Sequence, residues 1–486
     1  MRKILSAGLC LAVGAVLTAG FTACGNNRTD VAGGVVVVNN GDRIYAEGAD
    51  PSSLSVIDIG FTEAGFGREW LIEIAKSFVL ENKEYEIDLE GDPSLASSLK
   101  TKLESGKNLS DLYFPLNSAW ENYASRGWLE PLDDVYSEKV DGENGKTIEE
   151  KTDANYKDYA RYKTNEGSHY YILPWNDTVT GIVYNVKMFG QYGWEIPETT
   201  DELEELCKKI LADTNGKVKP FAYPGKIGGY FDYIGMTWWM QASGVDGVKK
   251  FFEFGSPEIY NATEQPAIGK KQALEEFLRF YAPEKGYCIP GSMGKDHTSS
   301  QMDFIGGAAA MILNANWLEC EMKTNMSEDF TMGMMSVPYI STAKKDENGN
   351  YVKVNYTAPP DYIFIPKGAA NKSGAKKFLA YMQRDDMLAL YTKITGSPRP
   401  FGYDLTAIEG LSKFNDDVMK IRSESATFFD YSRAGVYMYG YAQKYIGGQP
   451  YSALIRGETT PLRFCNVEYV EADNNWDDWE IGRAHV

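Results

Sequence analysis

The sequence predicts an α/β protein of two domains, each built on a mainly parallel β-sheet flanked by helices. The chain has 486 residues, 43% of them hydrophobic and 24% charged, which is a globular composition in a chain too long for one core. Apolar residues alternate with a period of two and then recur with a period of about 3.6, as in strands followed by helices. No period of about 20 to 50 residues repeats, which excludes a solenoid.

The first block of the chain alternates strands and helices. Strands are predicted over 54–59, 85–89 and 111–114, and helices over 70–79 and 95–103. In the first of these helices Trp70, Ile74 and Phe78 lie on one face, because they recur every four residues. Such short alternating units are typical of a parallel sheet covered by helices.

Ligands of parallel sheets bind outside the carboxyl ends of the strands. The loops that follow the three predicted strands are therefore candidate site loops. They span 61–67, 91–93 and 115–118.

A second block begins with a strand predicted over 181–185. Thr199 and Glu202 have the spacing of a capping box, which predicts the start of a helix. Cys207 lies on the apolar face of that helix and is most simply a core residue. Asn348-Gly349 predicts a hairpin turn.

The N-terminus has the features of an export signal. Arg2-Lys3 precedes an apolar run over 4–17, which is too short to span a membrane as a helix. Phe21-Thr-Ala-Cys24 resembles a bacterial lipobox, with Phe21 in place of the usual Leu. We predict a lipoprotein signal peptide over 1–23, lipidation of Cys24 and a flexible tether over 24–50. In the alternative interpretation, Cys24 is a spare thiol beyond an ordinary cleavage site.

Residues 481–486, Ile-Gly-Arg-Ala-His-Val, resemble a translated sequencing adapter, and we treat them as a suspected non-native tail.

Charge and motif content exclude several classes of protein. The formal charge is −19, from 49 basic and 68 acidic residues, and no basic patch is present, so nucleic acid is not an expected partner. The sequence contains no Cys-x-x-Cys, His-x-x-x-His, P-loop or Gly-x-Ser-x-Gly motif. His169, expected in a hairpin, and His297, expected in a polar loop, belong to no catalytic motif. We therefore expect no catalytic residue, no metal and no cofactor. The remaining cysteines allow three pairings or none: Cys207, Cys288, Cys320 and Cys465.

Four segments in order carry a resemblance to one family. They are 70–78 with the strand from Tyr85; 110–114 with the Gly-x-Leu-x-Pro-Leu-Asp-like turn over 124–133; 181–189 with Gly193, Pro197, Thr199 and Glu202; and 310–317. The last, Ala-Met-Ile-Leu-Asn-Ala-Asn-Trp, is similar to Ala-Met-x-x-x-Gly-x-Trp, with Ala315 in place of Gly. Together they resemble the extracellular solute-binding proteins of carbohydrate ABC importers, the group that includes maltose-binding protein.

This resemblance implies a periplasmic-binding-protein-like fold of two lobes joined by three hinge crossings. The crossings are expected near 174–181, 356–363 and 397–401. The N-terminal lobe would comprise 51–176 plus 361–397, and the C-terminal lobe 177–360 plus 398–480. Bending at the crossings would close the lobes on a ligand.

In the family the position of Trp317 lines the sugar site, and the resemblance assigns that role to Trp317. Its indole offers a flat face for the C–H side of a pyranose, and Asn314 and Asn316 offer donors and acceptors to hydroxyls. Trp317 is otherwise a core residue, and Asn314 a helix N-cap. Further candidates are Glu63, Phe66, Asn117, Trp175, Asp177, Trp238 and Asp361.

We therefore predict a non-enzymatic, monomeric lipoprotein on the extracellular face of a bacterial membrane. It would capture a carbohydrate, most simply an oligosaccharide, between its lobes and deliver it to the membrane subunits of an ABC importer. Alternatives are the same fold binding a peptide or polyamine, a sensor that presents its ligand to a membrane receptor, and a lipid-anchored glycoside-active enzyme with paired carboxylates.

Overall fold

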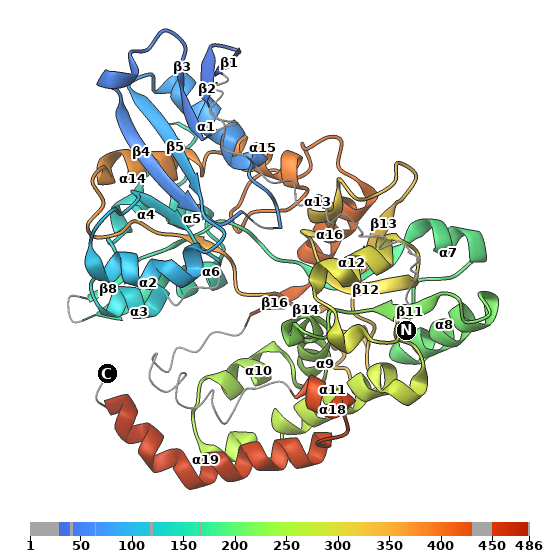
Figure 1. Ribbon diagram of the computed structural model, residues 1–486. Coiled ribbons are helices and arrows are strands. Elements are labelled where there is room, and N and C mark those ends of the chain that lie inside the picture. The colour runs from blue at the N-terminus through green and yellow to red at the C-terminus, as the bar shows by residue number, and fades with distance from the viewer. Residues whose placement is uncertain are drawn as a thin grey trace, which may run out of the picture.

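The computed structural model describes residues 29–38, 42–63, 65–116, 120–142, 144–164, 167–429 and 450–484 (Figure 1). These residues form two lobes, and each lobe surrounds its own hydrophobic core. In Figure 1 the first lobe is mainly blue and cyan, and the second is mainly green, yellow and red.

The first lobe holds a six-stranded sheet of order β1-β2-β3-β5-β4-β6. Its strands are β1 (Thr29–Ala32), β2 (Val35–Val38), β3 (Arg43–Ala46), β4 (Ser55–Phe61), β5 (Tyr85–Gly91) and β6 (Leu112–Phe114). Smaller strands are β7 (Arg161–Thr164), β8 (Gly167–Tyr170), β9 (Leu173–Pro174) and β15 (Tyr362–Ile363). Its helices are α1 (Glu69–Glu81), α2 (Leu95–Ser105), α3 (Trp120–Ser125), α4 (Asp133–Ser137), α5 (Ile148–Lys151), α6 (Ala154–Ala160), α14 (Lys372–Tyr381) and α15 (Asp385–Thr395).

Residues 29–38 and 43–46 correct the predicted tether, because they form three strands. β2 pairs with β1 and β3, and β3 pairs with β5 of the main sheet, all antiparallel. Gly33 and Gly34 form the two-residue turn between β1 and β2, with φ of 65° and 86°, values that favour glycine. The prediction of a flexible segment over 24–50 was therefore wrong from Thr29 on; Cys24 and the signal peptide lie outside the described residues.

The second lobe holds a four-stranded sheet of order β11-β12-β10-β13 and the pair β14-β16. These strands are β10 (Thr180–Asn185), β11 (Lys219–Ala222), β12 (Ala309–Ala315), β13 (Met332–Met335), β14 (Val354–Tyr356) and β16 (Ala426–Phe428). The helices are α7 (Val186–Tyr192), α8 (Thr200–Asp213), α9 (Asp232–Ser243), α10 (Val245–Phe252), α11 (Ala267–Tyr281), α12 (His297–Ile305), α13 (Leu318–Met322), α16 (Lys413–Glu424), α18 (Tyr451–Ile455) and α19 (Pro461–Ala484).

Both main sheets are mixed rather than mainly parallel. In the first, β4 is parallel to β5 and β6, while β1, β2 and β3 add antiparallel neighbours. In the second, only the pair β11-β12 is parallel, and β10 is antiparallel to β12 and β13. The carboxyl ends of β4, β5 and β6 therefore still meet at one edge, as do those of β11 and β12.

Strand β12 shows why each sheet is covered on both faces. Met311 and Leu313 belong to one hydrophobic cluster of the second lobe, and Ile312, between them, belongs to a second cluster of the same lobe. Because successive side chains of a strand point to opposite faces, a run of apolar residues buries both faces. The capping box predicted for α8 is present, with Thr199 and Glu202 each accepting a hydrogen bond from the other's backbone amide.

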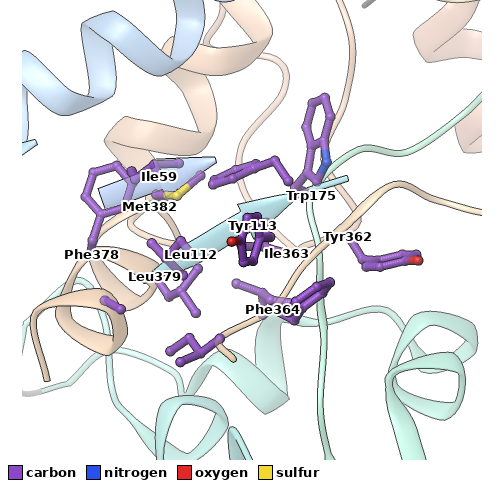
Figure 2. Packing of buried hydrophobic residues seen from close by; sticks show 14 of the residues in the cluster. Ile59, Leu112, Tyr113, Trp175, Tyr362, Ile363, Phe364, Phe378, Leu379 and Met382 are labelled. Atoms are coloured by element: carbon purple, nitrogen blue, oxygen red, sulfur yellow. The ribbon is translucent and has the colours of Figure 1, made fainter. Parts of the chain in front are cut away.

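Between residues 167 and 424 the chain passes from the core of one lobe to the core of the other three times. It does so between β9 and β10, between β14 and β15, and between α15 and α16. β9 and β15 pair with each other in the first lobe, so the first two passages leave that lobe side by side. Figure 2 shows the core beside this pair: Ile363 and Tyr113 pack near Leu379, and Trp175 lies at the end of the cluster away from Phe378.

Two properties of the described residues limit later arguments. No helix in this part of the chain has the length and apolar character needed to cross a membrane. The cysteines within the described ranges, Cys207, Cys288, Cys320 and Cys465, are all unpaired thiols.

Candidate functional site

The segment after β12 contains two amides that face inward. Asn316 has no exposed surface; its Nδ2 donates to the Asp177 carbonyl at 2.8 Å and to Ser397 Oγ at 2.6 Å, and its Oδ1 accepts from the Val179 amide at 3.2 Å. It therefore ties the first crossing to the third. Asn314 is also fully buried, and its Oδ1 accepts from the Ala315 amide. Neither amide reaches a surface in this structure, and their contact with a ligand stays a prediction.

Trp317 is different, because its side chain is only partly buried and packs against the cores of both lobes. Tyr230 and Tyr233 of the second lobe meet its indole edge-on, with ring centroids 6.5 and 6.2 Å away. From the first lobe Gly65 comes so close that a Cβ built on it would lie 3.4 Å from the Trp317 Cβ. Trp317 thus lies where the lobes meet.

On the first lobe an aromatic cluster lies under the same loop. Trp175 stacks on Trp70, with ring centroids 4.9 Å apart and planes at 18°, and Phe66 and Tyr391 contact Trp175 edge-on. Phe66 and Trp175 are nearly buried, so they support the loop more than they offer a face to a ligand. The Cys320 thiol donates to the Phe66 carbonyl at 3.5 Å, a second contact between this loop and the other lobe. The Trp175 Nε1 has no hydrogen-bond partner.

Asp361 lies on the second crossing, next to the aromatic residues of the second lobe. Its Oδ2 accepts from Asn176 Nδ2 at 2.9 Å, and its amide donates to Asn176 Oδ1 at 2.7 Å. Burial raises the pKa of this carboxyl to about 7, although the Asn176 hydrogen bond favours the charged form. After burial and nearer charges, the negative charge of Asp361 contributes to the raised pKa of Tyr233. Asp361 therefore stays a candidate beside Tyr233.

Asp177 has a structural partner set that was not predicted. Its carboxylate accepts a hydrogen bond from Tyr156 Oη at 2.5 Å and forms an ion pair with Arg422 Nε. Arg422 also donates to Asp153 at 2.9 Å. Asp177 is nearly buried and both its oxygens are paired, so this structure gives it a structural role, and its contact with a ligand stays a prediction.

Trp238 is a core residue of the second lobe. It has no exposed surface, its Nε1 donates to the Pro338 carbonyl at 2.9 Å, and it stacks on Phe280. In this structure α9 turns its indole toward the core, and its contact with a ligand stays a prediction. Asn117 lies outside the described residues.

Glu63 lines a cavity of about 670 Å³ on the first lobe. The predicted site loops 61–67 and 91–93 both contribute to it, together with the start of β3. Its lining carries five carboxylates and two arginines and no aromatic side chain. A pyranose would find acceptors there but no face to stack on. We therefore place the candidate site at the exposed parts of Trp317, Tyr230 and Asp361, with Tyr233 nearly buried beside the indole.

Tyr230 and Tyr233 were missed as site residues by the sequence reasoning. They belong to an aromatic stretch, 230–240, in which Trp238 was preferred. The difference in role comes from helix geometry: Tyr233 begins α9 near Trp317, whereas Trp238 lies one and a half turns further into the core. No local pattern distinguishes the two, because both faces of α9 are buried.

No metal site accompanies this surface, since the described ranges contain no cluster of three or more His, Cys, Asp or Glu that could hold an ion. His169 lies in the predicted hairpin β7-β8, far in sequence from the site, and its Nδ1 is hydrogen-bonded to Asp133 Oδ2 at 2.9 Å. The arrangement offers stacking faces and hydrogen-bond acceptors.

Comparison with known proteins identifies the family and the fold. The family model described as bacterial extracellular solute-binding protein matches residues 68–388. A maltotriose-binding protein of Pyrococcus abyssi is 24% identical over 308 residues, which cover 63% of this chain and 58% of the relative. A multiple sugar-binding protein of Streptococcus mutans is 24% identical over 332 residues, covering 68% of this chain and 71% of the relative.

Among solved structures, RafE of Streptococcus pneumoniae in its apo form superposes with a TM-score of 0.60 at 19% identity. The match covers 87% of this chain and 98% of RafE. RafE in complex with raffinose gives the same TM-score at 17% identity, covering 85% of this chain and 100% of that structure. At these identities the likeness concerns the fold alone.

Proposed function

Because the chain belongs to the bacterial extracellular solute-binding proteins, we propose that it captures a carbohydrate, an oligosaccharide in particular, between its two lobes and delivers it to an ABC importer. The two relatives named above support a sugar as the ligand, since one is a maltotriose-binding protein and the other a multiple sugar-binding protein. The single observation that carries the proposal is Trp317, a partly exposed indole that touches the cores of both lobes.

The chemistry of binding follows from the residues around Trp317. A pyranose is apolar on its C–H face and polar at its edge, so it stacks on an indole and hydrogen-bonds sideways. The rings of Tyr230 and Tyr233 contact that indole, and the charge of Asp361 acts on Tyr233, so the Asp361 carboxylate and the partly exposed Tyr230 phenol would serve hydroxyls. Closure of the lobes would bury the sugar. Each buried hydroxyl would then need a hydrogen-bond partner, because an unpaired polar group costs about 1 to 3 kcal/mol.

The location and the partner complete the proposal. Lipidation at Cys24 would hold the protein on the extracellular face of the membrane, where the importer subunits receive the sugar. We also propose that the protein is a monomer and that it releases the sugar unchanged. Its binding surface then needs no nucleophile and no pair of catalytic carboxylates.

A screen by thermal unfolding tests this function. The purified protein is heated with neutral oligosaccharides, peptides and polyamines. A ligand at one hundred times its Kd stabilises the native state by about 2.7 kcal/mol, which is a readable shift. The expected result is saturable stabilisation by one class of glycan, with the glycan recovered intact. Release of a shorter sugar would indicate an enzyme. Stabilisation by a polyamine alone would move the site to the acidic cavity beside Glu63.

A further inference from the structure

Glu321 lies one helical turn beyond Trp317, on the short helix α13. Its amide donates to the Trp317 carbonyl at 2.9 Å, so the two residues are held on the same side of that turn. Its side chain is 22% exposed, and its carboxylate is therefore accessible from the solvent side of the site.

The Glu321 carboxylate is held in place by a buried amide. Gln301 of α12 has no exposed surface, and its Nε2 donates to Glu321 Oε2 at 2.7 Å. The other oxygen, Oε1, is 3.9 Å from His297 Nε2, which is too long for a hydrogen bond. One carboxylate oxygen is thus fixed by the protein while the other has an open acceptor position.

The same carboxylate lies near both tyrosines of the candidate site. After burial, the charge of Glu321 is the next cause of the raised pKa of Tyr230. It also contributes to the raised pKa of Tyr233, after burial and the charges of Tyr230 and Asp232. The Glu321 carboxylate on α13 therefore acts on Tyr230 and Tyr233 at the start of α9, although the two helices are far apart in the sequence.

We propose that Glu321 is a specificity-determining residue that accepts hydrogen bonds from adjacent hydroxyls of a pyranose stacked on Trp317, with Gln301 as its positioning residue. The inference rests on the proposed function and adds to it the class of ligand group that is recognised, a pair of neighbouring hydroxyls. A carboxylate acceptor forms stronger hydrogen bonds than a neutral one. Because Gln301 already holds the Glu321 carboxylate through Oε2, little ordering of that side chain is needed when the sugar arrives.

The test uses four probes: maltotriose, raffinose, stachyose and diacetylchitobiose. Their Kd values are measured by titration calorimetry for the unchanged protein and for Glu321→Gln, which keeps the size of the side chain. For each probe that binds, we expect Glu321→Gln to raise Kd by about 10- to 100-fold, the effect of a charged hydrogen bond. A dideoxy form of that probe, lacking both recognised hydroxyls, should bind both proteins alike.

The matched control is Glu319→Gln, two residues away on α13. The Glu319 carboxylate accepts from Ser412 Oγ at 2.8 Å and serves α16 instead of the site, so Kd should stay within about twofold. The positioning role is tested by Gln301→Leu. Gln301→Leu alone should raise Kd, whereas Gln301→Leu added to Glu321→Gln should raise it no further. A general loss of stability would not produce this coupling.

The outcomes separate the two proposals. Unchanged affinity in Glu321→Gln, together with lost affinity in Trp317→Ala, overturns the role of Glu321 and leaves the function standing. If none of the four probes stabilises or binds the unchanged protein, the proposed function is overturned and the inference with it. Far-ultraviolet circular dichroism of each variant confirms that it is folded.

Discussion

Trp317 and Trp128 are both partly exposed indoles, and both contact a tyrosine ring. Trp128 stacks on Tyr123 within the first lobe, whereas Trp317 packs against both lobes. The side chains are chemically equal, so any difference between them in ligand binding comes from position. This pair provides a direct test of the site.

Replacing Trp317 with alanine should raise the Kd for a bound glycan by at least tenfold, because burial of the indole against a sugar contributes about 1.5 to 3 kcal/mol. Stability should fall by less than about 2 kcal/mol, since a half-buried tryptophan costs less than the 3 to 5 kcal/mol typical of a buried one. Trp128→Ala is the control and should bind normally. A loss of stability above about 3 kcal/mol would instead assign Trp317 to the core.

Asp58 is a second residue whose behaviour follows from its neighbours. It lies directly opposite Asp88 in the β4-β5 ladder. Burial, followed by the charges of Asp111 and Asp88, raises its pKa to about 6. Because the folded pKa lies above the unfolded value, the folded state binds the proton more tightly, and stability falls as pH rises from about 4 through 6.

Asp58→Asn should therefore stabilise the protein at pH 7, by no more than about 1 kcal/mol, because the carboxylate is desolvated only in part and solvent still screens its charge. The difference should vanish below about pH 4, where both proteins are neutral at this position. Urea unfolding at pH 4, 6 and 8 measures it. Equal stabilisation at every pH would mean that charge is not the cause.

At the scale of single elements, α19 depends on one buried ion pair. Lys270 of α11 binds Glu468 of α19 with Nζ and Oε1 2.6 Å apart, and the two side chains are 1% and 3% exposed. The ammonium also lies 5.0 to 5.3 Å from the ring centres of Trp239, Phe251 and Phe464. The last long helix is therefore attached to the second lobe through a charge enclosed by aromatic rings.

Lys270→Met should lower the free energy of unfolding by about 3 to 5 kcal/mol, because it leaves Glu468 buried without its cation. The neighbouring Lys271→Met is the control: Lys271 pairs with Glu275 on the exposed face of the same helix, and its loss should cost less than about 0.5 kcal/mol. Denaturant unfolding measures both. Equal effects would contradict the buried-pair explanation.

The elements themselves were largely predictable from sequence. The period of Trp70, Ile74 and Phe78 located α1, and the Thr199 capping box located the start of α8. The ribbon β1-β2-β3 was not predicted, because its valines show no alternation and its strength comes from pairing with β5, which is distant in sequence. Pairing direction was also beyond reach, since β10 is apolar on both faces in either orientation.

At the scale of the whole molecule, Arg422 connects the lobes beside the crossings. It lies on α16 of the second lobe and binds Asp177 on the first crossing and Asp153 at the start of α6 in the first lobe. Because Asp177 is nearly buried while Asp153 is 47% exposed, the two contacts differ in strength.

Arg422→Ala should destabilise the protein by about 3 kcal/mol, because the buried Asp177 carboxylate then keeps, among the described residues, the Tyr156 hydroxyl as its side-chain hydrogen-bond donor. The same change should widen the range of lobe arrangements. Asp153→Asn should cost less than about 1 kcal/mol. Thermal unfolding and small-angle scattering measure stability and the spread of lobe arrangements. A larger effect of Asp153→Asn than of Arg422→Ala would reverse this ranking.

The site was harder to predict than the fold for a physical reason. Trp317 was proposed as a site residue because the segment before it is recognisable along the chain. Asn316 and Asp177 have the same polar chemistry as ligand contacts, and only their long-range partners Ser397 and Arg422 show that they hold the crossings together. Sequence alone does not contain those distances.

Phe428 and Phe429 are neighbours in the chain, yet Phe428 packs in the second core and Phe429 in the first. A rotation of one lobe against the other therefore changes the backbone dihedral angles of Phe428 and Phe429, on either side of the planar peptide unit that joins them. The Phe428 carbonyl accepts from the Thr357 amide at 2.9 Å. Deuterium uptake at Thr357 should accordingly act as a built-in gauge of lobe movement, slow when a ligand locks the lobes and faster when they swing apart.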